Sequence, residues 1–183
     1  MKKVIYIVLG FIVILAVFSG CISLPKTPKH LPNQFWDEED YSQKIGEAIM
    51  DAIKEKDAQA LMKLFSPAVG ESVPTLSDQA EEFVDFFKGE IVSYDLEHLS
   101  ATIHADQGIV HACSFARCYV ITTESKYSFE FQTYYRYTDN SDMKGLYMLI
   151  TMEDLELHGK GNREFPKYDD DNIIPGIIFV PYE

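Results

Sequence analysis

The first half of the chain carries apolar residues at helical spacing. Between Asp40 and Lys56, apolar positions fall on one face of a helix and charged positions fall on the other. The apolar positions are Ile45, Ala48, Ile49, Ala52 and Ile53. This pattern predicts an amphipathic helix that directs one face toward a core.

Two shorter helices are predicted to follow. Asp57 can cap the first of them, which would end before Pro67 because the residue that precedes a proline disfavours helical geometry. Ser77 can cap the second, and Gly89 stands where a left-handed residue commonly closes a helix. Their inward residues would be Leu61, Leu64 and Phe65 in the first, and Ala80, Phe83, Val84 and Phe87 in the second.

From Glu90 onward the pattern has a period of two, which is typical of β-strands. The clearest strand covers residues 127–137, with one aromatic face and one mostly polar face. The aromatic face would carry Tyr127, Phe129, Phe131, Thr133, Tyr135 and Tyr137. The other face would carry Ser128, Glu130, Gln132, Tyr134 and Arg136.

Two further strands flank this one. In the segment 109–123, the even positions are small enough to let a helix approach closely, and they comprise Val110, Ala112, Ala116, Cys118 and Val120. The other flanking strand is predicted over 146–157, and Gln107-Gly108 and Glu124-Ser125 are plausible hairpin turns. Helices followed by strands predict an α+β domain in which a curved antiparallel meander packs on helices.

The C-terminal part combines an acidic loop with an apolar segment. Residues 169–172 read as a solvated acidic turn, because they lack the ligand spacing and the glycine of a calcium-binding loop. Residues 173–180 are too apolar to be left in water. We therefore expect them to return to the domain, either as an edge strand or as a cover for one end of it.

The N-terminus has the order of an export signal. Lys2 and Lys3 precede an apolar run over 4–18, and the small pair Ser19-Gly20 stands directly before Cys21. A positive start, an apolar run and small residues before a cleavage point together predict a secretory signal. An uncleaved membrane anchor is the alternative, because 4–20 is close to the shortest span that crosses a bilayer.

The segment 18–21, Phe-Ser-Gly-Cys, resembles the lipobox of bacterial lipoproteins. The resemblance implies a signal peptide over 1–20 and a mature chain that begins with Cys21 carrying diacylglycerol and fatty acyl chains such as palmitate. Residues 21–36 would then be a proline-rich linker, and 37–183 one domain. We therefore expect a lipid-anchored protein on the extracytoplasmic face of the cell membrane.

The charge of the chain limits its partners. The formal net charge is −13, and removal of Lys2 and Lys3 with the leader would make the mature chain more acidic. Such a protein will not hold nucleic acid by neutralising phosphates. Anionic lipid headgroups should also repel it, which suits a domain held away from the membrane on a tether.

Across roughly residues 40–157 the chain resembles the nuclear transport factor 2-like superfamily, and more narrowly the small bacterial lipoproteins that carry such a domain. The resemblance lies in the first amphipathic helix, in 56–66, in 86–91, in the aromatic strand and in Gly145-Leu146. It implies a cone made of a bent antiparallel sheet around helices, with a pocket in its mouth. Members use this pocket for catalysis, ligand binding or partner contact, and the fold does not decide among these.

Four residues of the aromatic strand are the candidate pocket lining. They are Tyr127, Phe131, Tyr135 and Tyr137. Packing of these rings in the core, with hydroxyl groups at the rim, is the competing interpretation. An enzyme would also need an ionisable group in the cone. No carboxylate falls on the aromatic face of this strand, and Asp85, the candidate acid from a helix, lies beside the apolar stripe of its helix rather than within it. No catalytic residue and no cofactor are therefore predicted.

Histidine and cysteine side chains of the first hairpin are candidate metal ligands. A two-residue turn at Gln107-Gly108 would place His104 opposite His111, with Cys113 on the same face. This set depends on one register, and no metal site is predicted from it. Cys113 and Cys118 would lie on opposite faces of one strand, so both should be reduced, with Cys118 in the core.

The sequence thus predicts a binding or interaction module of the cell envelope, for a small apolar ligand or an envelope protein. An enzyme that acts on a small hydrophobic substrate is one alternative. A scaffold that dimerises through its sheet is another, and it requires a filled cone and an exposed apolar patch. Phe115, Tyr119 and Ile121, opposite the small residues of their strand, are the candidates for such a patch.

Overall fold

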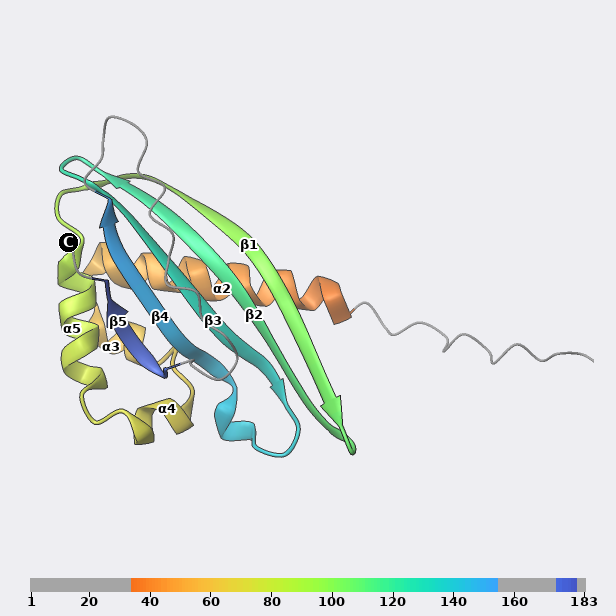
Figure 1. The fold of residues 1–183 in the computed structure, drawn as a ribbon. Coiled ribbons are helices and arrows are strands. Elements are labelled where there is room, and N and C mark those ends of the chain that lie inside the picture. Colours follow the sequence, from red (N-terminus) through yellow and green to blue (C-terminus); the bar gives the residue numbers. More distant parts are fainter. Residues whose placement is uncertain (1–33, 155–173, 181–183) are drawn as a thin grey trace, which may run out of the picture. The chain divides into compact units, whose positions relative to one another are not determined.

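The computed structural model describes residues 34–154 and 174–180 (Figure 1). Apart from Gln34, these residues belong to one compact unit, Phe35–Glu183. The predicted signal, Cys21 and the acidic loop 169–172 lie outside the described residues. Helix α2, Gln34–Glu55, begins within the segment predicted as a linker. Three residues of the predicted core-facing stripe, Ile49, Ala52 and Ile53, are buried, and the other two, Ile45 and Ala48, are half-buried.

Three short helices follow α2. Helix α3, Ala58–Met62, is capped as predicted by Asp57, whose carboxylate accepts a hydrogen bond from the Ala60 amide at 2.9 Å. Helix α4, Pro67–Ser72, was not predicted, although Ser66 caps it and a proline opens it. Helix α5, Leu76–Phe86, begins after Thr75, so the prediction that Ser77 caps it was wrong.

The strands form one mixed sheet in the order β1-β2-β3-β4-β5. Four strands form the predicted antiparallel meander: β1, Ile91–Asp106, β2, Ile109–Thr122, β3, Lys126–Tyr137, and β4, Gly145–Asp154. The short 3₁₀ helix η1, Ser141–Met143, connects β3 to β4. Strand β5, Gly176–Phe179, pairs in parallel with β4, as an edge strand. The domain is therefore α+β, with helices packed on a five-stranded sheet.

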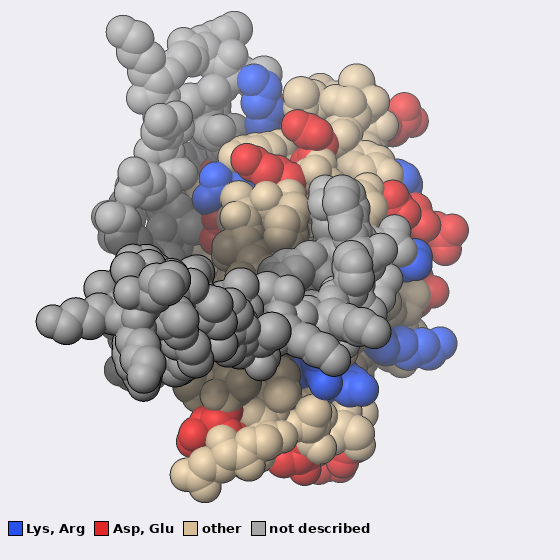
Figure 2. Space-filling model, turned by 90° about the vertical axis from the view of Figure 1, so that its right-hand side faces the viewer, with Lys and Arg blue, Asp and Glu red and all other residues tan. Residues whose placement is uncertain are grey.

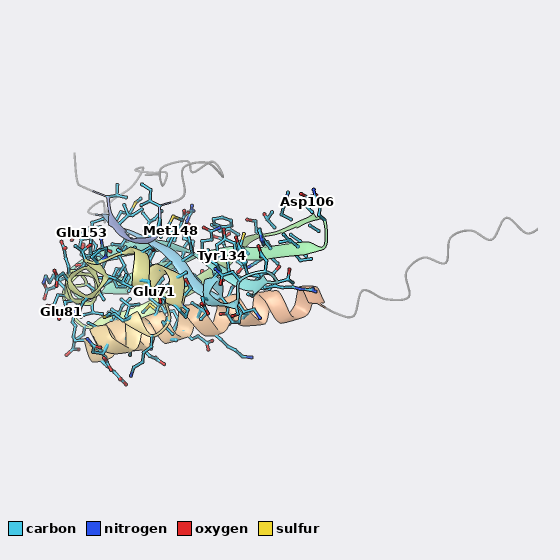
Figure 3. All side chains as sticks on the ribbon, turned by 90° about the horizontal axis from the view of Figure 1, so that it is seen from below. Glu71, Glu81, Asp106, Tyr134, Met148 and Glu153 are labelled. Atoms are coloured by element: carbon cyan, nitrogen blue, oxygen red, sulfur yellow. The ribbon has the colours of Figure 1, made fainter. Side chains whose placement is uncertain are left out.

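The Gln107-Gly108 turn sets the register of the β1–β2 hairpin. Both residues have positive φ, 48° and 89°, as tight hairpin turns require. The pairs His104↔His111, Ala105↔Val110 and Asp106↔Ile109 follow as predicted. Asp106 marks the end of this hairpin in the view from below (Figure 3).

The inner face of the sheet, defined as the face toward α2, carries the main core. It contributes the predicted small residues of β2, of which Ala112, Ala116, Cys118 and Val120 are buried. From α5, the ring of Phe83 meets the ring of Phe129 edge to face, with 5.9 Å between centroids. Figure 3 shows α2 running along this one face of the sheet. The opposite side is the outer face.

The two cysteines lie on opposite faces of β2 and are not joined by a disulfide. Cys118 is fully buried in the core, as predicted. Burial raises the pKa of its thiol to about 12, and the nearby charge of Asp95 adds to the shift. Cys118 is thus a packing residue rather than a reactive thiol.

Candidate functional site

Tyr127 and Phe131 pack in the core. Their exposed fractions are 2% and 1%. The Tyr127 hydroxyl accepts a hydrogen bond from the Lys88 amide at 2.9 Å, and its ring contacts those of Phe86 and Phe87. Burial raises the pKa of Tyr127. Both side chains therefore pack between the helices and the sheet, which agrees with the interpretation that these rings belong to the core.

Tyr135 and Tyr137 do not share a face. Ala112 pairs with Arg136 and Cys113 with Tyr134, so Tyr135 is an extra residue in a β-bulge. The bulge moves Tyr137 to the outer face, where its ring stacks on that of His111 at 3.8 Å. The predicted strict alternation from Tyr127 to Tyr137 was wrong at this point, because one inserted residue exchanges the faces of a strand.

Tyr135 lies at the inner face beside the start of α2. Its ring centroid is 6.4 Å from that of Tyr41, and burial raises the pKa of Tyr41. Tyr135 is thus separated from Tyr137 by the sheet and from the buried Tyr127 by the core. The structure does not gather the four candidate residues around one cavity.

A chain of buried hydroxyl groups links α2 to the sheet nearby. The Ser42 and Ser114 hydroxyls are 2.5 Å apart, and those of Ser114 and Thr133 are 2.8 Å apart. Each of the three residues is at most 2% exposed. Sequence reasoning missed this network, and its one signal was Ser114, a polar residue in the row of small residues on β2. The network satisfies its own polar groups, so it fixes the position of α2.

The histidine pair forms as predicted, but the described residues contain no group of three that could hold a metal. The rings of His104 and His111 are 6.5 Å apart between centroids. His111 instead contacts Asp139, with 3.0 Å between Nε2 and Oδ1, and stacks on Tyr137. The pair is part of an aromatic cluster on the outer face.

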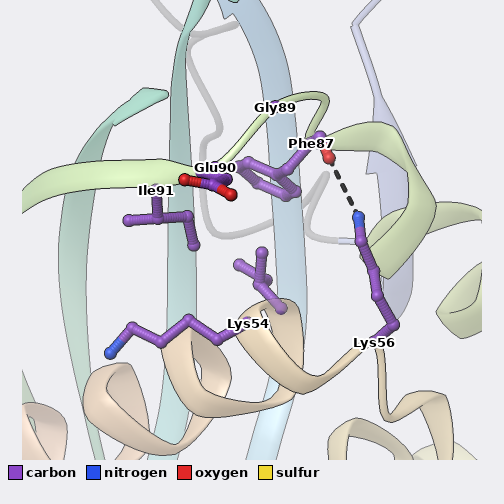
Figure 4. Close-up of a pocket in the computed structure, with 7 residues that line it drawn as sticks. Lys54, Lys56, Phe87, Gly89, Glu90 and Ile91 are labelled. Carbon is purple, nitrogen blue, oxygen red and sulfur yellow. Dashed lines mark hydrogen bonds between the residues drawn. The ribbon is translucent and has the colours of Figure 1, made fainter. Parts of the chain in front are cut away.

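A pocket of about 290 Å³ lies where α2 ends (Figure 4). Its walls are Ile53, Lys54, Lys56, Phe87, Gly89, Glu90 and Ile91. The Lys56 ammonium donates hydrogen bonds to two carbonyl oxygens at the end of α5, those of Val84 at 2.5 Å and Phe87 at 2.9 Å. Partial burial lowers the pKa of Lys56. Lys56 therefore caps α5 and is engaged by the protein itself.

We expect replacement of Lys56 by Met to reduce the free energy of unfolding by about 1–2 kcal/mol. Hydrogen bonds from a charged donor contribute about 1.5–3 kcal/mol, and solvent exposure of the side chain lowers this value. Lys63→Met, at an exposed position, is the matched control and should change the free energy by less than about 0.5 kcal/mol. Urea unfolding of both variants checks this, and equal midpoints would contradict the capping role.

A second pocket, of about 310 Å³, is acidic. It is lined by Glu82, Asp85, Phe86, Lys88 and Glu153. Asp85 is exposed here, so it is not the buried acid that an enzyme in the cone would need. Elsewhere, the part of the face in Figure 2 that is not covered by grey residues presents acidic and basic side chains side by side. Both pockets lie at the lower end of the range for ligand sites.

The outer face of β2 carries an exposed apolar patch, which we define as Phe115, Tyr119 and Ile121. Tyr119 and Ile121 are 42% and 41% exposed, and Phe115 is half-buried. Arg117 lies among them, fixed by two hydrogen bonds to Glu130 and by one from its Nη1 to the Tyr119 hydroxyl at 2.9 Å. The structure therefore places the three residues on the face where the sequence predicted them.

This outer patch continues into a buried apolar cluster. Met148, Ile150 and Met152 of β4 are at most 2% exposed, and Phe115 of the patch packs against them. Gln132, which pairs with Phe115 and Met148, is 1% exposed, and its side-chain carbonyl has no hydrogen-bond partner among the described residues. Sequence reasoning missed this second cluster, because the alternation in β4 is apolar on both faces.

The comparisons with known proteins place the chain in a family without giving it an activity. No curated protein matches the chain. One family model matches residues 48–154, from the middle of α2 to the end of β4, which is more than half of the chain. The chain therefore belongs to the family described as Domain of unknown function (DUF5104).

Proposed function

We propose that this protein is a lipid-anchored, extracytoplasmic interaction module that binds a protein partner through the outer face of its sheet. One observation carries the proposal: the inner face is filled along β3 and β4, whereas large apolar side chains of β2 are exposed on the outer face. Tyr127 and Phe131 occupy the interior, and Tyr119 and Ile121 remain exposed to solvent. Exposed apolar patches of this kind mark sites of protein interaction.

The proposed fold is the nuclear transport factor 2-like cone. The order of helices followed by a meander supports it, as does the packing of α2 and α5 on one face of the sheet. Gly145-Leu146, which carried part of the resemblance, opens β4 and joins it to residues 64–66 through two backbone hydrogen bonds. The bulge at Tyr135 is compatible with the bend of such a sheet.

The proposed anchor is the lipid on Cys21. Among the described residues, no helix is both long enough and apolar enough to cross a membrane. The argument for lipidation rests on the segment 18–21. Mass spectrometry of the N-terminal peptide, with and without Cys21→Ser, tests it: a diacylglycerol-modified Cys21 is expected, and an unmodified chain that still starts at Met1 would contradict it.

Binding of a small molecule has weaker support. Ligand pockets are commonly 300–1,000 Å³ and mostly enclosed. The pocket at the end of α2 has about 290 Å³, and one of its two ammonium groups is bound to backbone carbonyls. An enzyme has less support still: the ring of Tyr135 contacts that of Tyr41, and the buried polar network of Ser42, Ser114 and Thr133 consists of neutral hydroxyl groups.

Two variants separate the outer patch from the pocket. Tyr119→Ser with Ile121→Ser removes apolar area from the patch, and Lys54→Glu changes the charge of the pocket without touching the outer face. The full chain and both variants are extracted from membranes in a mild detergent, and sedimentation measures the size of the complexes that contain them. The proposal expects a complex larger than the monomer that only the patch variant loses. Loss through Lys54→Glu alone, or a monomer throughout, would contradict it.

A further inference from the structure

We propose that the open edge of β1, over Ser93–His98, binds an extended segment of another protein that carries basic residues at alternate positions. The segment would add a strand to the sheet. The edge of β1 adjoins the outer patch of β2, but it would bind through backbone groups rather than through the apolar side chains of the patch, so the inference goes beyond the function proposed above. The two share only the premise that the partner is a protein.

Strand β1 offers backbone groups on its open side. The sheet order places β1 at one end, paired only with β2 among the described strands. A strand hydrogen-bonds on two sides, so an edge strand presents a row of amide and carbonyl groups to a partner. Strand addition uses such a row for affinity and uses the side chains for specificity.

The side chains of β1 are exposed to an unusual degree. All of its residues are exposed except Ile91, Leu96 and Ala101, which are half-buried. Large apolar side chains are among the exposed ones, with Val92 at 64% and Ile103 at 46%. A long edge with exposed apolar residues favours pairing with another chain.

Two irregularities set the limits of the proposed site. The register between β1 and β2 shifts between Ile91 and Ser93 and again between His98 and Ser100. Bulges twist an edge and interrupt pairing. Between them, Ser93–His98 pairs regularly with β2, and its length is close to that of an ordinary strand.

Charge on this stretch selects the partner. Asp95 and Glu97 pair with Tyr119 and Arg117, so they lie on the outer face, and both are exposed. Tyr94 and Leu96 alternate with them on the inner face, where Lys54 lies 4.9 Å from the centre of the Tyr94 ring. A strand with lysine or arginine opposite the carboxylates and apolar residues between them complements this pattern.

The same charges disfavour pairing of this edge with a second copy of the chain. When two copies pair antiparallel with their outer faces on one side, Asp95 lies opposite Asp95 of the copy if that residue is at the two-fold axis. If Leu96 is at the axis, Asp95 lies opposite Glu97 of the copy. The symmetric pair would repeat this contact. Like charges directly opposite each other destabilise strand pairing, and the net charge of −13 adds to the repulsion.

The probe is a capped peptide of about eight residues, the length of an ordinary strand, with alternating lysine and valine. A glutamate–valine peptide tests charge, and a fully N-methylated lysine–valine peptide keeps its charge but cannot donate backbone hydrogen bonds. Binding to the full chain in non-ionic detergent is measured by fluorescence anisotropy. Hydrogen exchange then locates the protected amides.

The lysine–valine peptide should bind at least about tenfold more tightly than the other two and should slow exchange in Ser93–His98, because each cross-strand ion pair contributes modestly and the backbone contributes the rest. Asp95→Lys with Glu97→Lys should reverse the preference toward the glutamate peptide. Glu81→Lys with Glu82→Lys, on the exposed side of α5, makes the same change in net charge and should leave the preference intact.

Three results would overturn the inference: equal binding of the N-methylated peptide, equal loss of preference in the α5 variant, or protection that appears outside β1. Failure of the lysine–valine peptide to bind would also overturn it. Tyr119→Ser with Ile121→Ser keeps the backbone edge and both carboxylates of β1, so this variant should retain the preference for the lysine–valine peptide over the glutamate–valine peptide. A failure at the edge is therefore distinguishable from a failure of the outer patch.

Discussion

Replacing Phe129 by Ala should reduce the free energy of unfolding by about 3–5 kcal/mol, the cost of removing a large aromatic side chain from a packed core. Phe129 is fully buried at the centre of the inner face. Its ring meets Phe83 and Phe87 edge to face, at 5.9 and 6.2 Å, so the variant leaves a cavity between β3 and α5. Equilibrium urea unfolding of the full chain measures the loss.

Ile121→Ala is the matched control on the neighbouring strand. Ile121 is 41% exposed on the outer face, so its truncation should cost less than about 1 kcal/mol. A cost for Phe129→Ala as small as that for Ile121→Ala would show that the inner face is not the packed core of the domain.

Gly145→Ala should reduce the free energy of unfolding by about 2–4 kcal/mol. Gly145 has a φ of 133°, which other residues rarely adopt, and an added Cβ would lie 2.9 Å from the Ser66 amide nitrogen. Backbone atoms cannot move aside cheaply here, because Leu146 exchanges hydrogen bonds of 2.8 and 2.9 Å with Leu64 and Ser66. The connection between α3 and β4 would therefore open.

Gly70→Ala provides the contrast within the same protein. Gly70 lies in α4, and an added Cβ would meet no atom within 4 Å. The substitution should leave stability unchanged or raise it by about 0.4–1 kcal/mol, because alanine favours helices and restricts the unfolded chain. Thermal unfolding measures the midpoint temperature of both variants. Equal shifts of this midpoint would contradict the close approach of the Gly145 and Ser66 backbones.

Much of the fold could be predicted where local patterns agree with tertiary packing. The small residues of β2 indicated a helix on that face, and the Gln107-Gly108 turn indicated the register of the first hairpin. The bulge at Tyr135 could not be predicted, because a single inserted residue leaves the residue types of the strand unchanged while it exchanges their faces. Helix α4 was missed because it buries little more than Val69.

The candidate site was less predictable than the fold. An aromatic row on one face of a strand looks the same whether it lines a cavity or fills a core, and the helices decide which. Here Phe83 and Phe86 of α5, with Phe87 directly after it, pack against that row and close the space beside Tyr127 and Phe129. The outer patch on β2 was recognisable, because no tertiary contact is needed to place alternate residues of a strand on opposite faces.

A photo-crosslinking amino acid at position 119 tests most directly whether the outer face is the working surface. The full chain is expressed in the cells that naturally produce it, with p-benzoylphenylalanine in place of Tyr119, and with the same residue in place of Glu81 on α5 as the exposed control. We expect a discrete protein adduct from position 119 that is absent from position 81 and is lost when Ile121 is also changed to Glu. No adduct at position 119, or the same adducts from both positions, would contradict the account.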